Sequence, residues 1–267
     1  FDIVDEMVKA RMPPVGNEDS WQGTNEQLDE AGQLAVVMWK TGDQHEKALR
    51  LLDRVLGALL LRTSPTAQSV LTHKANRAGL LKDIGEVEQA RRLYEEEVLP
   101  GQIDTLGESH VKTLLSKMNY AILVRANHPD RAGKLLDEAI VGFTVELGES
   151  HVHTLQARQG LAGLHKQKGE YIVARSVYEE VVAQQERHME LGPQHTETIR
   201  SKANLATVLR MLGDNDASKR VWEEVVAAKS QQLGAGHPST LRAKYNLSMV
   251  LKRLGDWNGA FELRKEA

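Results

Sequence analysis

The sequence predicts an all-α protein, a solenoid of about six helix-turn-helix units, and three observations lead to this fold class. A Leu-Gly-x-x-His-x-x-Thr motif recurs with its histidines at positions 110, 151, 195 and 237, so the steps are 41, 44 and 42 residues. A second block, Leu93-Tyr94-Glu95-Glu96 in one copy, recurs at steps of 42 or 44 residues. Aromatic residues make up only 4% of the chain, and Ala, Leu and Val carry most of the apolar content. A fixed period of this size is typical of stacked repeats that bury their apolar faces against one another.

The repeats divide almost the whole chain. We expect a cap or connector over residues 1–25, with a short amphipathic helix in 1–12, and a repeat array over 26–267. The predicted units cover approximately residues 26–62, 66–104, 108–146, 149–190, 193–232 and 235–267.

Each unit is expected to be a hairpin of two helices. In the last unit, residues 239–254 carry apolar side chains at helical spacing, and Gly255 follows, where a glycine commonly ends a helix. Pro238 suits the first helical position, because its missing N–H would have no intrahelical partner there. The third unit has Asn127-His128-Pro129-Asp130 at its break. The other breaks begin at Gly42, Gly85, Gly169 and Gly213.

Charge and composition exclude several classes of function. The net charge of −3 and the pI of about 6.4 give no sign of nucleic-acid binding. There is no run of 18 apolar residues, so we expect no membrane insertion. The absence of cysteine excludes disulfides, thiolate metal sites and cysteine nucleophiles. We expect a soluble protein of the cytoplasm or an organelle lumen, and the start at Phe1 indicates a fragment or a removed upstream segment.

The two-helix units, with a glycine at the break and a small residue early in the second helix, resemble tetratricopeptide repeats. Asn204-Leu205-Ala206 with Gly213-Asp214 carries this likeness, and the period with the junction at 233–241 is similar to the kinesin-light-chain subclass. The resemblance covers roughly residues 27–267. It implies a right-handed solenoid with each first helix on the concave face. The coiled-coil heptads that hold the motor in kinesin light chains are absent, so no motor subunit is implied.

A column of asparagines lies nine residues before the break in four units. An asparagine side chain both donates and accepts hydrogen bonds, so a ladder of them suits an extended peptide backbone, and the resemblance implies such a role. Alternatively, these asparagines bond neighbouring helices. The candidates are Asn76, Asn119, Asn204 and Asn246, with Gly160 in the fourth unit.

A column of basic residues follows six positions later in five units. One interpretation is that a cation in the last turn of a helix interacts favourably with the helix dipole, by roughly 0.3–1 kcal/mol. The other is a groove that attracts an acidic peptide or protein surface. Trp39 replaces the basic residue in the first unit, which predicts an apolar anchor there. The column is Lys82, Arg125, Lys166, Arg210 and Lys252, and Arg200 and Arg242 are expected to face the same groove.

One tetratricopeptide function is not expected. The resemblance implies that binders of Hsp70 or Hsp90 C-terminal tails hold a carboxylate with Lys one residue before, and Asn three after, the column asparagine. The first position holds Ala75, Met118, Gln159, Ala203 and Tyr245 here, and the second holds Gly79, Ile122, Gly163, Thr207 and Met249. No position carries the required residue.

The junction histidines are expected to be structural. Stacking holds equivalent histidines about one repeat apart, so they cannot converge on one ion, and His151 with His153 is too little for a metal site. The recurring Glu-Glu pairs are expected on solvated helix faces, because acid–base chemistry needs their two pKa values to be split. No phosphate loop, nucleophile elbow or metal-ligand cluster occurs. We therefore expect no catalytic residue, no metal and no cofactor.

The leading hypothesis is a non-enzymatic scaffold for protein–protein interaction, which binds a partner peptide or segment, acidic in character, in the concave groove. The alternatives are a structural subunit of a larger assembly, and the regulatory repeat domain of a longer protein.

Overall fold

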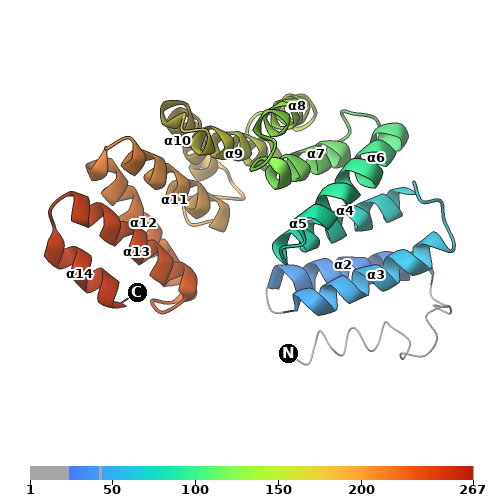
Figure 1. Cartoon of the computed structure of the whole chain (residues 1–267), viewed down its shortest axis with the longest axis horizontal. Coiled ribbons are helices and arrows are strands. Elements are labelled where there is room, and N and C mark those ends of the chain that lie inside the picture. Colours follow the sequence, from blue (N-terminus) through green and yellow to red (C-terminus); the bar gives the residue numbers. More distant parts are fainter. Residues whose placement is uncertain (1–23, 42–43, 267) are drawn as a thin grey trace. The chain divides into compact units, whose positions relative to one another are not determined.

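The computed structural model describes residues 24–41 and 44–266, and every regular element in these ranges is a helix (Figure 1). The all-α class predicted from the repeats is therefore confirmed. The expected helix in 1–12, almost all of the connector 13–25 and the break at Gly42 lie outside the described residues. The chain forms two compact units, residues 1–131 and 132–267, which are described separately.

The N-terminal unit is built from helical hairpins. Consecutive helices pack against each other, and the first helices α2, α4 and α7 also contact one another in order. Leu28, Leu52 and Leu59 are fully buried in the core. The elements are α2 (Asn25–Thr41), α3 (His45–Leu60), α4 (Gln68–Asp83), α5 (Val87–Arg92), η1 (Leu93–Val98), α6 (Leu99–Leu106) and α7 (Val111–Val124).

One second helix contains a π-helical turn that the repeat pattern did not predict. The stretch from Val87 to Leu106 is continuously helical, but η1 within it has the wider π geometry. Pro100 gives the physical reason, because its nitrogen cannot donate to the carbonyl of Glu96 and its ring would clash with that carbonyl in a regular α-helix. A π turn accommodates such a residue inside a helix.

The C-terminal unit continues the hairpins, and α8 (Pro129–Leu147) starts just before the boundary between the units. Tyr178 and Val208 lie in one buried cluster, and Trp222 and Val250 lie in another. None of the described helices has the length and apolarity needed to span a membrane. The remaining helices are α9 (Val152–Gln167), α10 (Tyr171–Arg187), α11 (Thr196–Met211), α12 (Asn215–Leu233), α13 (Pro238–Arg253) and α14 (Trp257–Glu266).

The junction histidines are the N-caps of first helices. In each case Nδ1 of the imidazole accepts a hydrogen bond from the backbone N–H two residues later, at 3.1 or 3.2 Å. This satisfies one of the four N–H groups that a helix start leaves without a partner. The glycine three residues before each histidine has positive φ, 92° at Gly234 for example, where a side chain would be strained. The capping residues are His110, His151, His195 and His237.

Candidate functional site

A pocket of about 440 Å³ between α11, α12 and α13 brings together four of the predicted site residues. We call it the α11–α13 pocket. Arg200 and Asn204 are four residues apart on α11, and Arg242 and Asn246 are four apart on α13, so each pair shares one helix face. The repeat places the two pairs at the same level of neighbouring first helices.

The asparagine and basic columns bond to each other at one point in the C-terminal unit. Lys166 Nζ on α9 donates to Asn204 Oδ1 on α11 at 2.8 Å. The predicted bond between neighbouring helices is therefore present at this position. Because the Asn204 oxygen accepts from Lys166, its NH2 group remains as a donor at the pocket.

Arg200 is neutralised within the protein. Its guanidinium forms an ion pair with Glu197 on the same helix and donates to Gln159 Oε1 at 2.6 Å. Gln159 also donates to Ser201. Arg200 therefore positions neighbouring polar side chains and offers little net charge to a ligand.

Lys229 and Arg242 differ from Arg200 because neither has an acidic partner among the described residues. Lys229 Nζ donates to the Ser239 hydroxyl, and no carboxylate lines the pocket. Burial lowers the pKa of Lys229, and the nearby positive charge of Arg242 lowers it further. The pocket therefore holds two cations that repel each other and have no counter-charge.

A third column of basic residues, which was not predicted from the sequence, consists of cations that are neutralised by acidic residues of the same protein. It lies two residues before the asparagine column, and its members are largely buried. Lys74 Nζ lies 2.7 Å from Glu97, Arg158 lies 3.2 Å from Glu180, and Lys202 lies 2.7 Å from Glu224. The column is Lys74, Lys117, Arg158, Lys202 and Lys244.

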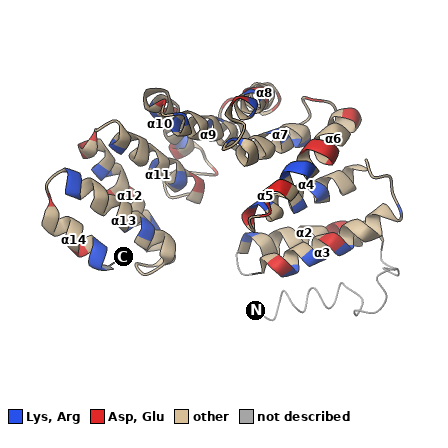
Figure 2. Cartoon of the chain, in the orientation of Figure 1, with Lys and Arg blue, Asp and Glu red and all other residues tan. Residues whose placement is uncertain are grey.

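The Glu-Glu pairs lie largely on exposed helix faces, as predicted, and several of these glutamates also form ion pairs. Glu180 and Glu224 pair with the buried cations above, whereas Glu179 and Glu223 pair with the residue four positions earlier on the same helix. In these two copies of the block, both glutamates therefore have a basic partner within the protein. Acidic and basic residues are interspersed over both units (Figure 2). The unpaired cations of the α11–α13 pocket therefore differ from the other basic residues in lacking an acidic partner, and not in their number.

Lys229 lies on a second helix, α12, outside the two columns predicted on first helices. Its equivalents in the other repeats are Gly101, Phe143 and Gln185, which are buried. The sequence signal for Lys229 is a lysine at a repeat position where the other repeats have buried residues.

Trp222, on the wall of the pocket, has a buried indole N–H without a hydrogen-bond partner in the described part of the chain. The equivalent Tyr94 donates its hydroxyl to the Ala75 carbonyl at 3.2 Å. The carbonyl equivalent to that of Ala75 belongs to Ala203, and Thr207 Oγ1 already donates to it at 2.8 Å. The tryptophan is therefore left as an unused donor.

The other predicted site residues are not gathered in this pocket. Lys82, Lys166, Arg210 and Lys252 lie in the last turns of their helices, and Arg125 is a C-cap, as the helix-dipole interpretation requires. Asn76 is half-buried on α4 and Asn119 is exposed on α7.

Two of these positions have intramolecular partners of their own. Lys82 lies 3.1 Å from Asp83, whose carboxylate also accepts from the Trp39 indole at 2.9 Å. Because Trp39 packs against Gly79, its ring is partly covered. Lys252 Nζ lies 5.4 Å from the centre of the Trp257 ring.

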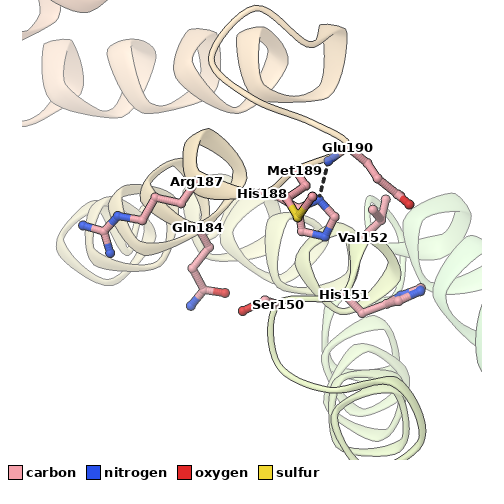
Figure 3. Close-up of a pocket in the computed structure, with 8 residues that line it drawn as sticks. All are labelled: Ser150, His151, Val152, Gln184, Arg187, His188, Met189 and Glu190. Atoms are coloured by element: carbon pink, nitrogen blue, oxygen red, sulfur yellow. Dashed lines mark hydrogen bonds between the residues drawn. The ribbon is translucent and has the colours of Figure 1, made fainter.

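A second pocket, of about 670 Å³, lies beside the longer junction between α10 and α11. Residues 150–152, 184, 187 and 188–190 line it, and the Glu190 N–H donates to His188 Nδ1 at 3.2 Å (Figure 3). Burial and the neighbouring His153 lower the pKa of His151. Across the described ranges, no three His, Asp or Glu side chains are placed to hold one metal ion.

Stacked two-helix units with a donor-rich face on their first helices define the class as a helical repeat protein. The family profile described as tetratricopeptide repeat matches residues 195–267. Comparison with the curated proteins finds no match. Nearly identical TPR-like repeats ascribed to a kinesin light chain of Podosopora anserina are 26% identical, with a TM-score of 0.62 over 76% of this chain and 93% of that one. Residues 195–267 thus match a tetratricopeptide repeat, and the chain is similar over 76% of its length to TPR-like repeats of the kinesin-light-chain kind.

More distant structures share the fold. BtubC (BKLC) from P. vanneervenii is 18% identical, with a TM-score of 0.63 over 91% of this chain and 89% of that one. NprR, solved in complex with its cognate peptide NprX, is 14% identical, with a TM-score of 0.68 over 98% of this chain and 70% of that one. The tetratricopeptide match and the similarity to the TPR-like repeats indicate a scaffold for protein–protein interaction, and such scaffolds are typically non-enzymatic.

Proposed function

We propose that this chain binds an extended segment of a partner protein, acidic in character, along the faces of its first helices. The α11–α13 pocket is the observation that carries the proposal. It combines the amide groups of Asn204 and Asn246 with the cations Lys229 and Arg242. Amides suit a peptide backbone whatever its sequence, and unpaired cations favour an acidic partner.

The column residues outside the pocket extend this surface within each unit. Asn76 and Asn119, with Lys82 and Arg125, would serve the N-terminal unit, and Lys166, Arg210 and Lys252 would serve the C-terminal unit. The neighbour NprR, whose structure contains its cognate peptide, supports peptide binding by this fold.

The experiment compares proteins captured from the native source by wild-type protein and by Asn204→Ala with Arg210→Glu. We expect the variant to lose the captured partner while its circular dichroism remains unchanged. The matched control is Asn258→Ala with Arg220→Glu, which removes one amide and reverses one charge at exposed positions outside the pocket. An unchanged partner affinity in the first variant would contradict the proposal.

A second candidate function, a permanent subunit of a larger assembly, is favoured by the face of α14. Trp257 is 62% exposed and Phe261 is 66% exposed. The equivalents of Phe261 in two other repeats are Arg175 and Lys219, which form ion pairs on the helix surface. Phe261→Glu would release the chain from a stable complex on native gel filtration if this face is an assembly contact. A wild-type monomer in native extract would contradict it.

A further inference from the structure

The polar groups of the α11–α13 pocket have more donors and more positive charge than the protein itself can satisfy. Asn204 has its NH2 group left after Lys166 occupies its oxygen. Ser239 accepts from Lys229, so its hydroxyl hydrogen remains available. The Trp222 N–H has no acceptor in the described residues. A donor without an acceptor is destabilising when it is removed from water, so a ligand that brings acceptors is favoured.

The unpaired charge indicates which acceptor fits. Lys229 and Arg242 together supply two positive charges without a carboxylate beside them. A carboxylate carries one negative charge and two oxygens, whereas a phosphate monoester carries about −1.5 to −2 at neutral pH and three acceptor oxygens. A phosphate monoester therefore matches both the charge and the number of donors, and a single Asp or Glu side chain matches neither.

The position of the pocket relates this group to a peptide. Asn204 and Asn246 belong to the asparagine column, so a backbone held by that column would carry its side chains past the pocket. Arg200, held by Glu197 and Gln159, forms one edge of the pocket without adding unpaired charge. The pocket's volume of about 440 Å³ leaves room for one side chain bearing a phosphate group.

We infer that the α11–α13 pocket binds a phosphate monoester, carried as a phosphorylated serine, threonine or tyrosine of the partner segment. Lys229 and Arg242 bind the phosphate oxygens, and Asn204 and Ser239 supply further donors around it. This inference rests on the proposed function, since it specifies the chemistry of the partner at that site.

The test measures binding of three capped peptides of one alanine- and serine-rich sequence, with phosphoserine, glutamate or serine at the centre. Inorganic phosphate is the fourth probe. We expect the phosphoserine peptide to bind at least about tenfold more tightly than the glutamate peptide, because charge-assisted hydrogen bonds contribute more than about 1.4 kcal/mol each. Tighter binding of the peptide than of inorganic phosphate shows that the phosphate is recognised on a peptide; equal binding would overturn the assignment to a partner segment.

Two variants then locate the binding. Lys229→Met and Arg242→Gln should each remove the preference for phosphoserine over glutamate, whereas Arg220→Gln, on the exposed face of α12, should keep it. Lys229→Arg should restore it. NMR titration of the Lys229 side chain gives an independent readout, because bound phosphate should raise the pKa of that amine. A phosphoserine preference that survives Lys229→Met and Arg242→Gln would refute the inference, as would its absence from the wild-type protein.

Failure of this inference is distinguishable from failure of the proposed function. If the glutamate peptide binds as well as the phosphoserine peptide, and Asn204→Ala weakens both, the peptide groove stands and the phosphate inference is wrong. If only inorganic phosphate binds, both are wrong.

Discussion

The two units of the molecule each contain a pocket beside a second helix, and the pockets have opposite charge. In the N-terminal unit, a pocket of about 380 Å³ has three carboxylates, Glu96, Glu97 and Asp104, around the single cation Lys74. In the C-terminal unit, the α11–α13 pocket has three cations and no carboxylate. The comparison teaches that a basic residue of the repeat indicates a binding site only where no acidic residue accompanies it.

The two pockets are lined mostly by different repeat positions and share only two of them. Gly101 and Asp104 line the first pocket, and their equivalents Lys229 and Gln232 line the second. A Cβ at Gly101 would lie 2.8 Å from a methyl carbon of Leu71, so a side chain there would require Leu71 to shift. The α11–α13 pocket thus gains a cation and loses an acid at positions that the fold shares.

The largest effect on the free energy of unfolding is expected where a neutralised cation loses its acidic partners. Lys202 lies 2.6 Å from Glu186 and 2.7 Å from Glu224, and its side chain is only 12% exposed. Glu186→Gln with Glu224→Gln should lower the free energy of unfolding by about 2 kcal/mol, because a largely buried charge loses its partners. Urea titration measures the change.

The matched control for that variant is Glu223→Gln, since Glu223 forms an exposed pair with Lys219 four residues earlier. It should change the free energy of unfolding by less than about 0.5 kcal/mol. Equal effects of the two variants would show that the buried column is not neutralised in the way the contacts indicate.

A substitution at a helix junction is expected to have an intermediate effect on the free energy of unfolding, and this effect depends on pH. The pKa of the capping His151 is lowered by burial and by the neighbouring His153. Its contribution to stability is therefore complete above the ordinary histidine pKa of about 6.5 and is lost as the pH falls towards the lower pKa of the folded state. His151→Asn keeps a good N-cap but removes this titration, so about 1 kcal/mol of the loss at acidic pH should disappear.

Thermal unfolding of wild type and His151→Asn, at pH values on either side of the ordinary histidine pKa, measures this difference. The two proteins should differ more at acidic than at neutral pH, with the variant the more stable at acidic pH. Parallel pH profiles would contradict the assigned role of His151.

The smallest effect on stability is expected at the unpaired cations. Lys229→Met should change the free energy of unfolding by less than about 0.5 kcal/mol or raise it, because the repulsion from Arg242 is relieved and no ion pair is broken. Urea titration beside the Lys202 pair variant measures the contrast. A loss as large as that of the pair variant would place Lys229 among the structural cations.

The sequence was sufficient for the fold and for four of the residues that line the α11–α13 pocket, for physical reasons. The fold depends on local signals that repeat, such as the glycine and the capping histidine around Leu233 to Leu241. Four residues of the pocket were predicted because each pair lies four positions apart on one face of its own helix. The pairs are Arg200 with Asn204 and Arg242 with Asn246.

The rest of the pocket depends on contacts that the chain alone does not display. Whether a cation is neutralised depends on an acid from another helix, as Lys202 and Glu224 show. The unused Trp222 donor arises because Thr207 competes for one carbonyl. The π turn at η1 follows a single proline, Pro100, which does not recur in the other repeats and therefore leaves no periodic signal.

The junction of a positive-φ glycine and a capping histidine contains both the stop of one helix and the start of the next. Neither signal needs a residue from a distant part of the chain, since the histidine caps a backbone N–H only two residues away. A duplicated repeat that runs from one Leu-Gly pair to the next therefore contains the signals that end one helix and start the following helix. Arrays of this kind can gain or lose whole repeats. The residues that line a pocket in a new repeat can then change independently of those in its neighbours.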